Sequence, residues 1–239
     1  MNGLWGVIQA RMASTRLPGK VLRELAGKPL IWHIADRLRR VPGLDGIVIA
    51  TTKNPEDDAL EAFAHDQRLA VFRHEGVDDI AGRLAGAARL TGADGFLKVN
   101  GDCPLVDPDI LRRLVERMGA ADRPDFVSNK MTSSYPEGLG AEAITTRALT
   151  WCDDNLTAPA DREYVADWIR DNDGRFAVAS ITGEHDLGHH GWAVDTPSDF
   201  AFAAQVFAEL YQPGGCFGMQ EVLQLVERKT TPVAVARDA

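Results

Sequence analysis

The sequence predicts an α/β fold in which a mostly parallel β-sheet is flanked by helices. Short apolar segments alternate with helix-patterned segments through the first half of the chain. A capping side chain followed by proline, which is typical of a helix start, recurs at Asn54-Pro55, Asp107-Pro108 and Thr196-Pro197. The 239 residues, with 45% hydrophobic and 26% charged side chains, suit one globular domain of the larger α/β kind.

The first half of the chain supplies a regular series of strands and helices. Strands are predicted at residues 4–10, 46–51, 69–73 and 95–100, and helices at 30–41, from 55 onward, at 80–91 and at 108–118. This alternation predicts βαβ units with right-handed crossovers.

The pattern weakens after about residue 120. A loop is expected at 129–138, strands at 126–128, 140–146, 176–181 and 191–194, and helices at 159–172, 197–210 and 219–228. No repeat or linker interrupts the chain, so residues 1–239 are predicted to form a single domain.

The loop after the first strand is basic. It carries Arg11, Arg16 and Lys20, and no acidic residue precedes Glu24 although the formal net charge of the chain is -9. Removing water from three like charges is costly unless an anion meets them. Because α/β proteins bind ligands at strand carboxyl ends, we expect this loop to bind a polyphosphate, with Ser14 contributing its hydroxyl. A solvated surface loop is the alternative, and the glycine spacing excludes a P-loop.

Two aspartates follow predicted strands. Asp102 follows the predicted strand at 95–100, and Asp195 follows the short predicted strand at 191–194. Both are therefore expected at the carboxyl edge of the sheet. Such a pair suits Mg²⁺, which takes one or two protein carboxylates plus phosphate oxygens and water. The alternative for each alone is a turn or cap residue. Asp107 and Asp199 fit helix-start positions, and His189-His190 lacks a third metal ligand.

Composition excludes several classes of partner. A pI near 5.1 argues against sequence-independent nucleic-acid binding. No apolar run reaches the length of a membrane span, and the N-terminus lacks the features of a signal peptide. We therefore expect a cytoplasmic protein with neither nucleic-acid nor membrane partners. The three cysteines show no metal or disulfide spacing and are expected to be reduced.

The motif IQARMASTRLPGKVL, followed by GKPL, resembles the opening of cytidylyltransferases that make CMP-activated acidic sugars. The resemblance is strongest to the SpsF-like branch named for spore-coat polysaccharide biosynthesis, and CMP-Kdo and acylneuraminate cytidylyltransferases are more distant. Later motifs agree in order up to about residue 227: TTKNPEDDAL, GADGFLKVNGDCPLVDPDI, VSN, YPEGL, DREYV and WAVDTPSDF.

This resemblance implies a Rossmann-like nucleotide-diphospho-sugar transferase fold with a small β-containing insertion at roughly 130–190, and a homodimer formed through that insertion. It implies transfer of CMP from CTP to a sugar acid with release of pyrophosphate, dependent on Mg²⁺. Same-fold alternatives are a glycosyltransferase, a nucleotidyltransferase that uses another NTP, and an inactive nucleotide-binding protein. A glycosyltransferase would usually carry a DxD motif, but Cys103-Pro104 follows Asp102.

The resemblance also assigns site residues. It implies nucleotide contacts from Ala10, Arg11, Ser14, Arg16, Lys20, Thr51, Arg83 and Asp102, catalytic roles for Arg11, Arg16, Lys20 and Asp102, metal binding by Asp102 and Asp195, and acceptor contacts from Asn129, Glu142, Arg162 and Glu163. Two departures fall in the acceptor region. Gly140 stands where the family commonly has Asp, and Tyr164 where it often has His.

Overall fold

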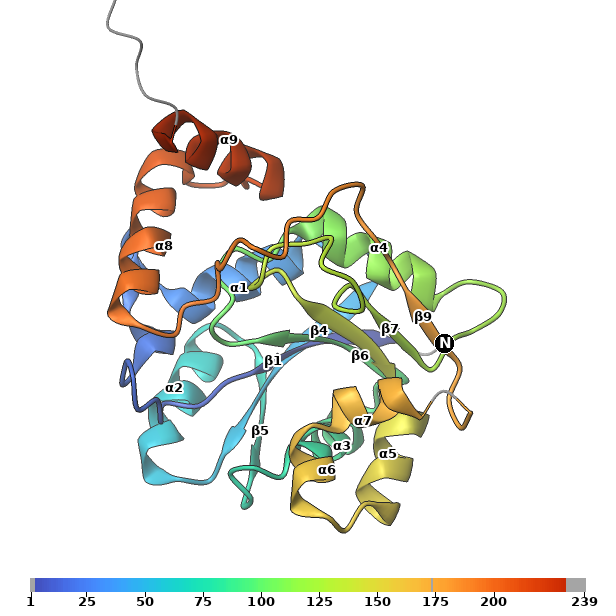
Figure 1. The fold of residues 1–239 in the computed structure, drawn as a ribbon. Helices are drawn as coiled ribbons and strands as arrows, with labels where there is room; N and C mark the ends of the chain where they lie inside the picture. The colour runs from blue at the N-terminus through green and yellow to red at the C-terminus, as the bar shows by residue number, and fades with distance from the viewer. Residues whose placement is uncertain (1–2, 173, 231–239) are drawn as a thin grey trace, which may run out of the picture.

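The computed structural model describes residues 3–172 and 174–230, which form a seven-stranded sheet between layers of helices (Figure 1). The sheet contains β1 (Leu4–Gln9), β4 (Leu44–Thr52), β5 (Ala70–His74), β6 (Gly95–Asn100), β7 (Phe126–Ser128), β8 (Ala141–Thr145) and β9 (Val178–Ser180). A small hairpin pairs β2 (Glu24–Leu25) with β3 (Lys28–Pro29). The α-helices are α1 (Leu30–Arg39), α2 (Asp58–Asp66), α3 (Ile80–Thr91), α4 (Pro108–Met118), α5 (Thr146–Asn155), α6 (Pro159–Glu163), α7 (Val165–Asp171), α8 (Pro197–Leu210) and α9 (Met219–Thr230).

The strand order is β5-β4-β1-β6-β8-β7-β9. The first four strands of this order run parallel, β8 is antiparallel to both of its neighbours, and β9 is parallel to β7. The prediction of a mostly parallel sheet is therefore confirmed. After β5 the chain crosses to the other side of β1, so the order reverses between β1 and β6, where open α/β sheets form their ligand crevice.

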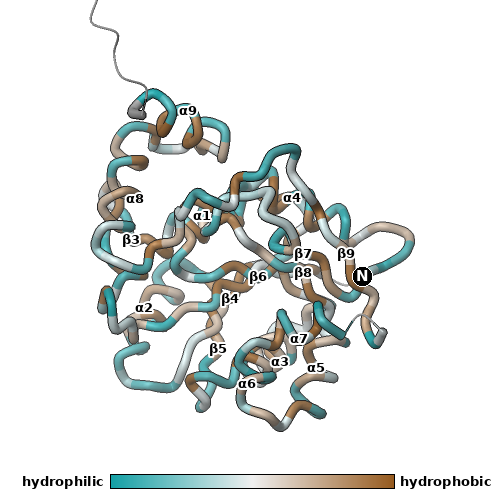
Figure 2. The backbone as a smooth tube through the Cα atoms, viewed as in Figure 1, coloured by the Kyte–Doolittle hydropathy of each residue, from teal (hydrophilic) through white to brown (hydrophobic). Residues whose placement is uncertain are grey.

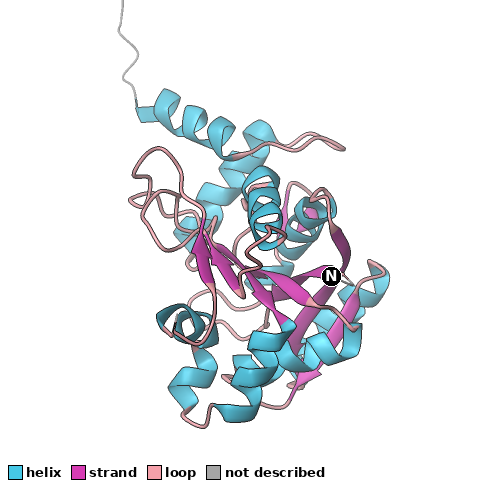
Figure 3. Cartoon of the chain, turned by 90° about the vertical axis from the view of Figure 1, so that its right-hand side faces the viewer, coloured by secondary structure: helices cyan, strands magenta, loops and turns pink. Residues whose placement is uncertain are grey.

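Neighbouring residues of β1 face different cores. Ile8 packs with residues of α1, α2, α4 and α8, whereas Val7 packs with residues of α3, α5 and α7, and both side chains are fully buried. Figure 1 shows α1 and α4 on one side of the sheet and α3, α5, α6 and α7 on the other, and Figure 3 shows strands between helices. Hydrophobic residues accordingly concentrate along the central strands (Figure 2).

Two of the predicted helix starts have capping side chains. The Asp107 carboxylate accepts a hydrogen bond from the Asp109 N–H (2.7 Å), and Thr196 with Asp199 forms a capping box at α8. The helix-start roles expected for Asp107 and Asp199 are confirmed. Asn54 makes no side-chain cap; Pro55 instead opens a 3₁₀ turn, Pro55–Asp57, and α2 begins after it.

The second half departs from prediction in three places. The predicted helix at 159–172 is broken at Tyr164, whose backbone (φ -99°, ψ 41°) separates α6 from α7. Helix α5 was not predicted, because it buries only a narrow apolar side against α3. Residues 191–194 are not a strand. Gly191 makes one isolated β-bridge to Glu137, and Trp192 is buried although it belongs to no strand.

Other sequence-based expectations concern the thiols and membrane spans. Cys103, Cys152 and Cys216 are all free thiols, in agreement with the prediction. In the part of the chain that the structure describes, no helix combines the length and the hydrophobicity that crossing a bilayer requires.

Candidate functional site

A cleft of about 980 Å³ opens at the carboxyl ends of β1 and β6. The basic loop at 10–21, the turn before α3, the end of β6 and the α6–α7 junction form its walls. Ten of the residues predicted for the site line it: Ala10, Arg11, Ser14, Arg16, Lys20, Arg83, Asp102, Glu142, Glu163 and Asp195. The structure thus brings together segments that are almost 200 residues apart in sequence.

Lys20 contacts both Asp102, which follows β6, and Asp195, which follows the irregular segment at 191–194. Its Nζ lies 3.1 Å from Asp102 Oδ2 and 2.8 Å from Asp195 Oδ1, and it also donates to the Val194 carbonyl at 2.8 Å. Arg16 forms a second ion pair with Asp195 at 3.0 Å. Burial alone would lower the pKa of the Lys20 ammonium, but Asp102 and Asp195 outweigh it and hold that pKa above its usual value. Lys20 is therefore a fixed cation in the cleft.

The shared contact shows that Asp102 and Asp195 can face one cation. An ammonium group stands in for that cation, and a pair of carboxylates is a donor set that suits Mg²⁺ when phosphate oxygens and water complete the shell. Among residues 3–172 and 174–230, no group of three His, Cys, Asp or Glu side chains is placed to hold a metal ion.

The buried carboxylate of Asp57 connects the basic loop to strand β4 by hydrogen bonds. Asp57 is fully buried and accepts hydrogen bonds from the Met12 N–H (2.6 Å), from the Thr52 N–H (3.2 Å) and from the Thr52 hydroxyl. At the loop's end, Gly19 adopts a left-handed backbone (φ +67°), and its N–H bonds the Met12 carbonyl. The sequence pattern placed Asp57 only in a helix-start segment and missed this contact.

The cleft also requires close approach of two strand ends. A Cβ at Gly101 would lie 2.7 Å from Ala10 Cβ and 3.1 Å from the Gln9 carbonyl oxygen. Glycine at this position lets the β6 end pass against the β1 end, and so places Asp102 beside the basic loop.

Arg83 is buried at the base of the turn before α3. It donates to the Gly76 carbonyl (3.0 Å) and to the Val77 carbonyl, and burial lowers the pKa of its guanidinium. Among the side chains that the structure describes, the buried polar atoms without a hydrogen-bond partner are Gln9 Oε1, Thr51 Oγ1 and Arg83 Nε. Gln9 and Arg83 line the cleft, whereas Thr51 lies in β4 outside its lining.

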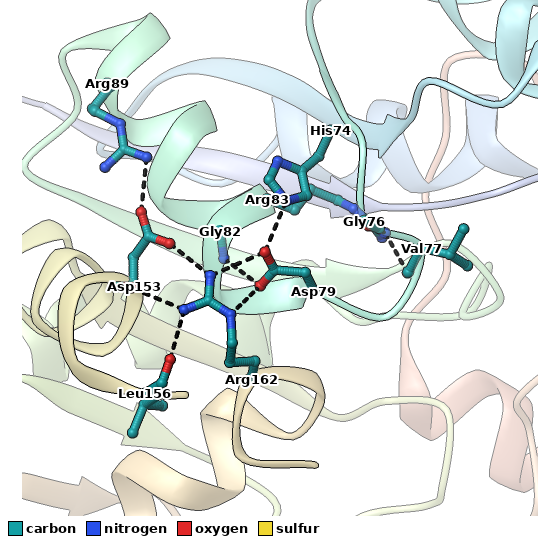
Figure 4. A network of polar contacts seen from close by, with 10 residues as sticks. All are labelled: His74, Gly76, Val77, Asp79, Gly82, Arg83, Arg89, Asp153, Leu156 and Arg162. Carbon is teal, nitrogen blue, oxygen red and sulfur yellow. Dashed lines mark hydrogen bonds and ion pairs between the residues drawn. The ribbon is translucent and has the colours of Figure 1, made fainter. Parts of the chain in front are cut away.

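Arg162 lies outside the cleft lining, which argues against its assignment to acceptor binding. Figure 4 shows its guanidinium between Asp79 and Asp153. It makes five hydrogen bonds: Nε to Asp79 Oδ1 (2.8 Å), Nη2 to Asp79 Oδ2 (3.0 Å) and Asp153 Oδ1 (2.8 Å), and Nη1 to the carbonyls of Asp153 (2.8 Å) and Leu156 (2.9 Å). Because these bonds use every guanidinium donor, Arg162 joins α6 to the start of α3 instead of binding a ligand.

Asn129 is likewise buried outside the cleft. Its Nδ2 donates to the Leu139 carbonyl (2.9 Å) and its Oδ1 accepts from the Ala141 N–H (2.8 Å). The side chain therefore closes the loop that leads into β8, which positions Glu142.

Two lysines of the cleft lining were missed by the sequence analysis. Lys98 is the one charged residue in the β6 sequence GFLKVN, and Lys130 follows the VSN motif. Both bond Glu142, at 3.2 Å from Lys98 Nζ and 2.8 Å from Lys130 Nζ. A lysine in the middle of an apolar strand was the signal that could have identified the first of them.

Comparisons with known proteins find a family model, related sequences and similar solved structures. A family model described as cytidylyltransferase matches residues 5–193. The spore coat polysaccharide biosynthesis protein SpsF of Bacillus subtilis (strain 168) is 36% identical over 224 residues, which cover 90% of this chain and 89% of the relative. A 3-deoxy-manno-octulosonate cytidylyltransferase of Vibrio vulnificus (strain YJ016) is 32% identical over 187 residues, covering 77% and 70%. The structure of a cytidylyltransferase from Leptospira borgpetersenii serovar Hardjo-bovis matches with a TM-score of 0.87 and 25% identity, covering 95% and 94%.

Proposed function

The chain belongs to the cytidylyltransferase family, and from this premise we propose that it transfers CMP from CTP to a sugar acid, with release of pyrophosphate and with Mg²⁺ as cofactor. The observation that carries the proposal is the meeting of Lys20 with Asp102 and Asp195 inside a cleft whose loop also presents Arg11 and Arg16. This arrangement offers fixed cations for a triphosphate beside carboxylates suited to a metal.

The basic loop would bind the phosphates. Arg11 pairs with Asp78 at 3.3 Å and Arg16 with Asp195 at 3.0 Å, and the side chains of both arginines are substantially exposed. Exposed pairs of this kind are worth only about 0–1 kcal/mol, so either guanidinium can exchange its carboxylate for phosphate oxygens at little cost. Ser14 would add a hydroxyl donor from the same loop.

Gln9 at the end of β1 and Arg83 in the first turn of α3 would contact the nucleoside. Gln9 Oε1 and Arg83 Nε are a buried acceptor and a buried donor in the cleft lining, and neither has a partner in the protein. Buried polar groups in native proteins are nearly always paired, so these two are available to the polar edge of a ligand.

Asp102 and Asp195 would hold the Mg²⁺ ion, which neutralises phosphate charge when it is bound. The acceptor hydroxyl would attack the α-phosphorus, forming the new P–O bond as the bond to the β-phosphate oxygen breaks. Pyrophosphate would leave and the hydroxyl proton would pass to solvent. Negative charge shifts toward the leaving group, and Lys20 and Arg16 are the cations positioned to stabilise it.

The test is pyrophosphate release from CTP with Mg²⁺ and a panel of acids that includes 3-deoxy-manno-octulosonate and N-acetylneuraminate. Lys20→Ala and Asp102→Asn are expected to abolish release while thermal unfolding stays cooperative. Lys53→Ala is the matched control, because Lys53 makes an exposed pair with Glu75 and lies outside the cleft lining. Near-wild-type release by either site variant would contradict the assignment.

Binding experiments separate the alternatives. Thermal shift with the four NTPs should show stabilisation by CTP above the other three. Stabilisation by ATP or GTP alone would indicate another nucleotidyltransferase, and CTP binding without turnover across the whole acceptor panel would indicate a binding protein without activity.

A further inference from the structure

A second cluster of charges lies in the cleft beyond Asp102. Lys98 of β6 and Glu142 of β8 stand directly opposite each other in the antiparallel ladder, and their side chains are almost fully buried. Lys98 Nζ bonds Glu142 Oε2 at 3.2 Å and Asn100 Oδ1 at 3.0 Å, while Lys130 Nζ bonds Glu142 Oε1 at 2.8 Å. All four of these residues line the cleft.

The cluster carries more positive than negative charge. Burial alone would raise the pKa of Glu142, but the two lysines outweigh it and lower that pKa, and Glu142 in turn raises the pKa of Lys130. Glu142 and Lys130 are therefore held in their charged forms, and the Nζ atoms of two lysines, Lys98 and Lys130, share one carboxylate. Lys130 is partly exposed in the cleft lining, so its ammonium group can contact an anionic group of a ligand while it keeps its bond to Glu142.

An acidic residue of the opposite wall offsets part of this positive charge. Asp167 faces Lys130, but its carboxylate already pairs with Arg170 at 2.6 Å. Glu163, at the end of α6, also lines the cleft. Its carboxylate is not among the groups with the largest effect on the pKa of Lys130 or of Glu142.

Gly140 makes room for one of the two lysines. A Cβ at this position would lie 2.8 Å from Lys130 Cδ and 2.9 Å from Lys130 Cγ. The aliphatic part of the Lys130 side chain therefore packs against the Gly140 Cα, and its Nζ bonds Glu142. Any side chain at position 140 would have to displace that stem. This departure from the resembled family is therefore coupled to the presence of Lys130 in the cleft.

We propose that Lys98 and Lys130 bind the carboxylate of the acceptor, and that Gly140 permits this contact by leaving space for Lys130. The inference rests on the proposed function and defines the acceptor as a carboxylic acid. The nucleotide phosphates have their own cations, Arg11, Arg16 and Lys20, on the loop after β1. Lys98 lies in β6 and Asp102 follows the end of that strand by two residues, so an acid held by Lys98 would share the cleft with the carboxylate proposed to hold the metal.

The test is calorimetric titration of the protein, saturated with Mg²⁺ and a non-hydrolysable CTP analogue, with acids and with their primary amides. The acids are 3-deoxy-manno-octulosonate and N-acetylneuraminate. Wild-type protein is expected to bind at least one acid roughly 10- to 100-fold more tightly than its amide, the range of a hydrogen bond to a charged group. Lys130→Met and Gly140→Ala should remove most of this preference and leave affinity for the CTP analogue within about twofold.

Lys130→Met is the primary variant because the Lys130 side chain is 44% exposed, and Lys53→Met is the matched control outside the cleft. An unchanged preference for the acid in Lys130→Met overturns the inference. So does equal weakening of acid and CTP analogue, which would assign the lysines to a nucleotide phosphate, or failure of the wild-type protein to bind any acid. The proposed function is judged separately by pyrophosphate release, since turnover of a sugar acid together with an unchanged acid-over-amide preference in Lys130→Met would preserve it while refuting this acid site.

Discussion

Arg162 donates a hydrogen bond to each carboxylate oxygen of Asp79, with Nε 2.8 Å from Oδ1 and Nη2 3.0 Å from Oδ2 (Figure 4). Asp79 caps α3 through the Gly82 N–H and also contacts His74 at 2.9 Å. The cleft lining includes residues immediately before Asp79 and immediately after Arg162. This one ion pair therefore connects the wall proposed for the nucleoside with the wall that carries Glu163.

Arg162→Lys should weaken the connection between α6 and the start of α3 while keeping a positive charge at position 162. Lysine cannot form the paired, planar contact, nor reach the carbonyls of Asp153 and Leu156 together. We expect a loss of about 1–3 kcal/mol in the free energy of unfolding, measured in urea, and a higher KM for CTP. Arg112→Lys, at an exposed pair with Glu116, is the control and should stay within about 0.5 kcal/mol. A stable variant with an unchanged KM would show that the contact is dispensable.

Asp79 should make stability depend on pH in the acid range. Burial opposes ionisation, but hydrogen bonds from Arg162, Gly82 and His74 hold the pKa of Asp79 at about 2 in the folded protein. An unfolded aspartate titrates near 3.9, so the contribution is complete above about pH 4 and is lost as the pH falls toward 2. The measurement is urea unfolding of wild type and Asp79→Asn between pH 6 and pH 3. Wild type should have a free energy of unfolding higher than that of Asp79→Asn by about 2 kcal/mol or less at pH 6, and this difference should shrink at pH 3. A difference that stays constant with pH would refute a stabilising role for the ionised Asp79.

Lys20→Met should strengthen metal binding while weakening catalysis. The Lys20 ammonium bridges Asp102 and Asp195, so a divalent ion has to replace that contact. Without the lysine, Asp102 loses this ion pair and Asp195 keeps only its exposed pair with Arg16, so the attraction of the two carboxylates for a cation rises. Calorimetry with Mn²⁺, in the absence of nucleotide, should show tighter binding to Lys20→Met than to wild type. Asp102→Asn/Lys20→Met is the control and should lose the gain. Weaker Mn²⁺ binding by Lys20→Met alone would contradict the shared site.

Asp57→Asn should loosen the basic loop. The amide keeps one acceptor oxygen but puts its NH2 donor against either the Met12 N–H or the Thr52 N–H, which bond different oxygens of Asp57 in this fully buried site. We expect a loss of about 2 kcal/mol in stability and a roughly tenfold higher KM for CTP. Asp58→Asn, in an exposed position next in sequence, is the control. An unchanged KM in a destabilised variant would limit Asp57 to a role in folding.

Much of the fold follows from local patterns that the sequence shows directly. The segments at 4–10, 46–51 and 95–100 are predominantly apolar, which is the local pattern expected of strands that helices cover on both faces. The caps at Asp107 and Thr196 are short-range hydrogen bonds. The same locality made the basic loop recognisable, because its charges and its preceding strand are contiguous.

Tertiary structure alone decided which charges are paired. Arg162 and Asn129 have residue types that suit ligand binding, yet their partners, Asp79 and Leu139, occupy their hydrogen-bonding groups. Lys98 and Lys130 meet at Glu142 because β6 and β8 are adjacent in the sheet. Electrostatic and hydrogen-bond energies depend on distances between atoms of remote segments, which residue type and spacing do not specify. The sequence by itself therefore determined the fold class and the basic loop, whereas the packing of the sheet determined which side chains remain free for substrate.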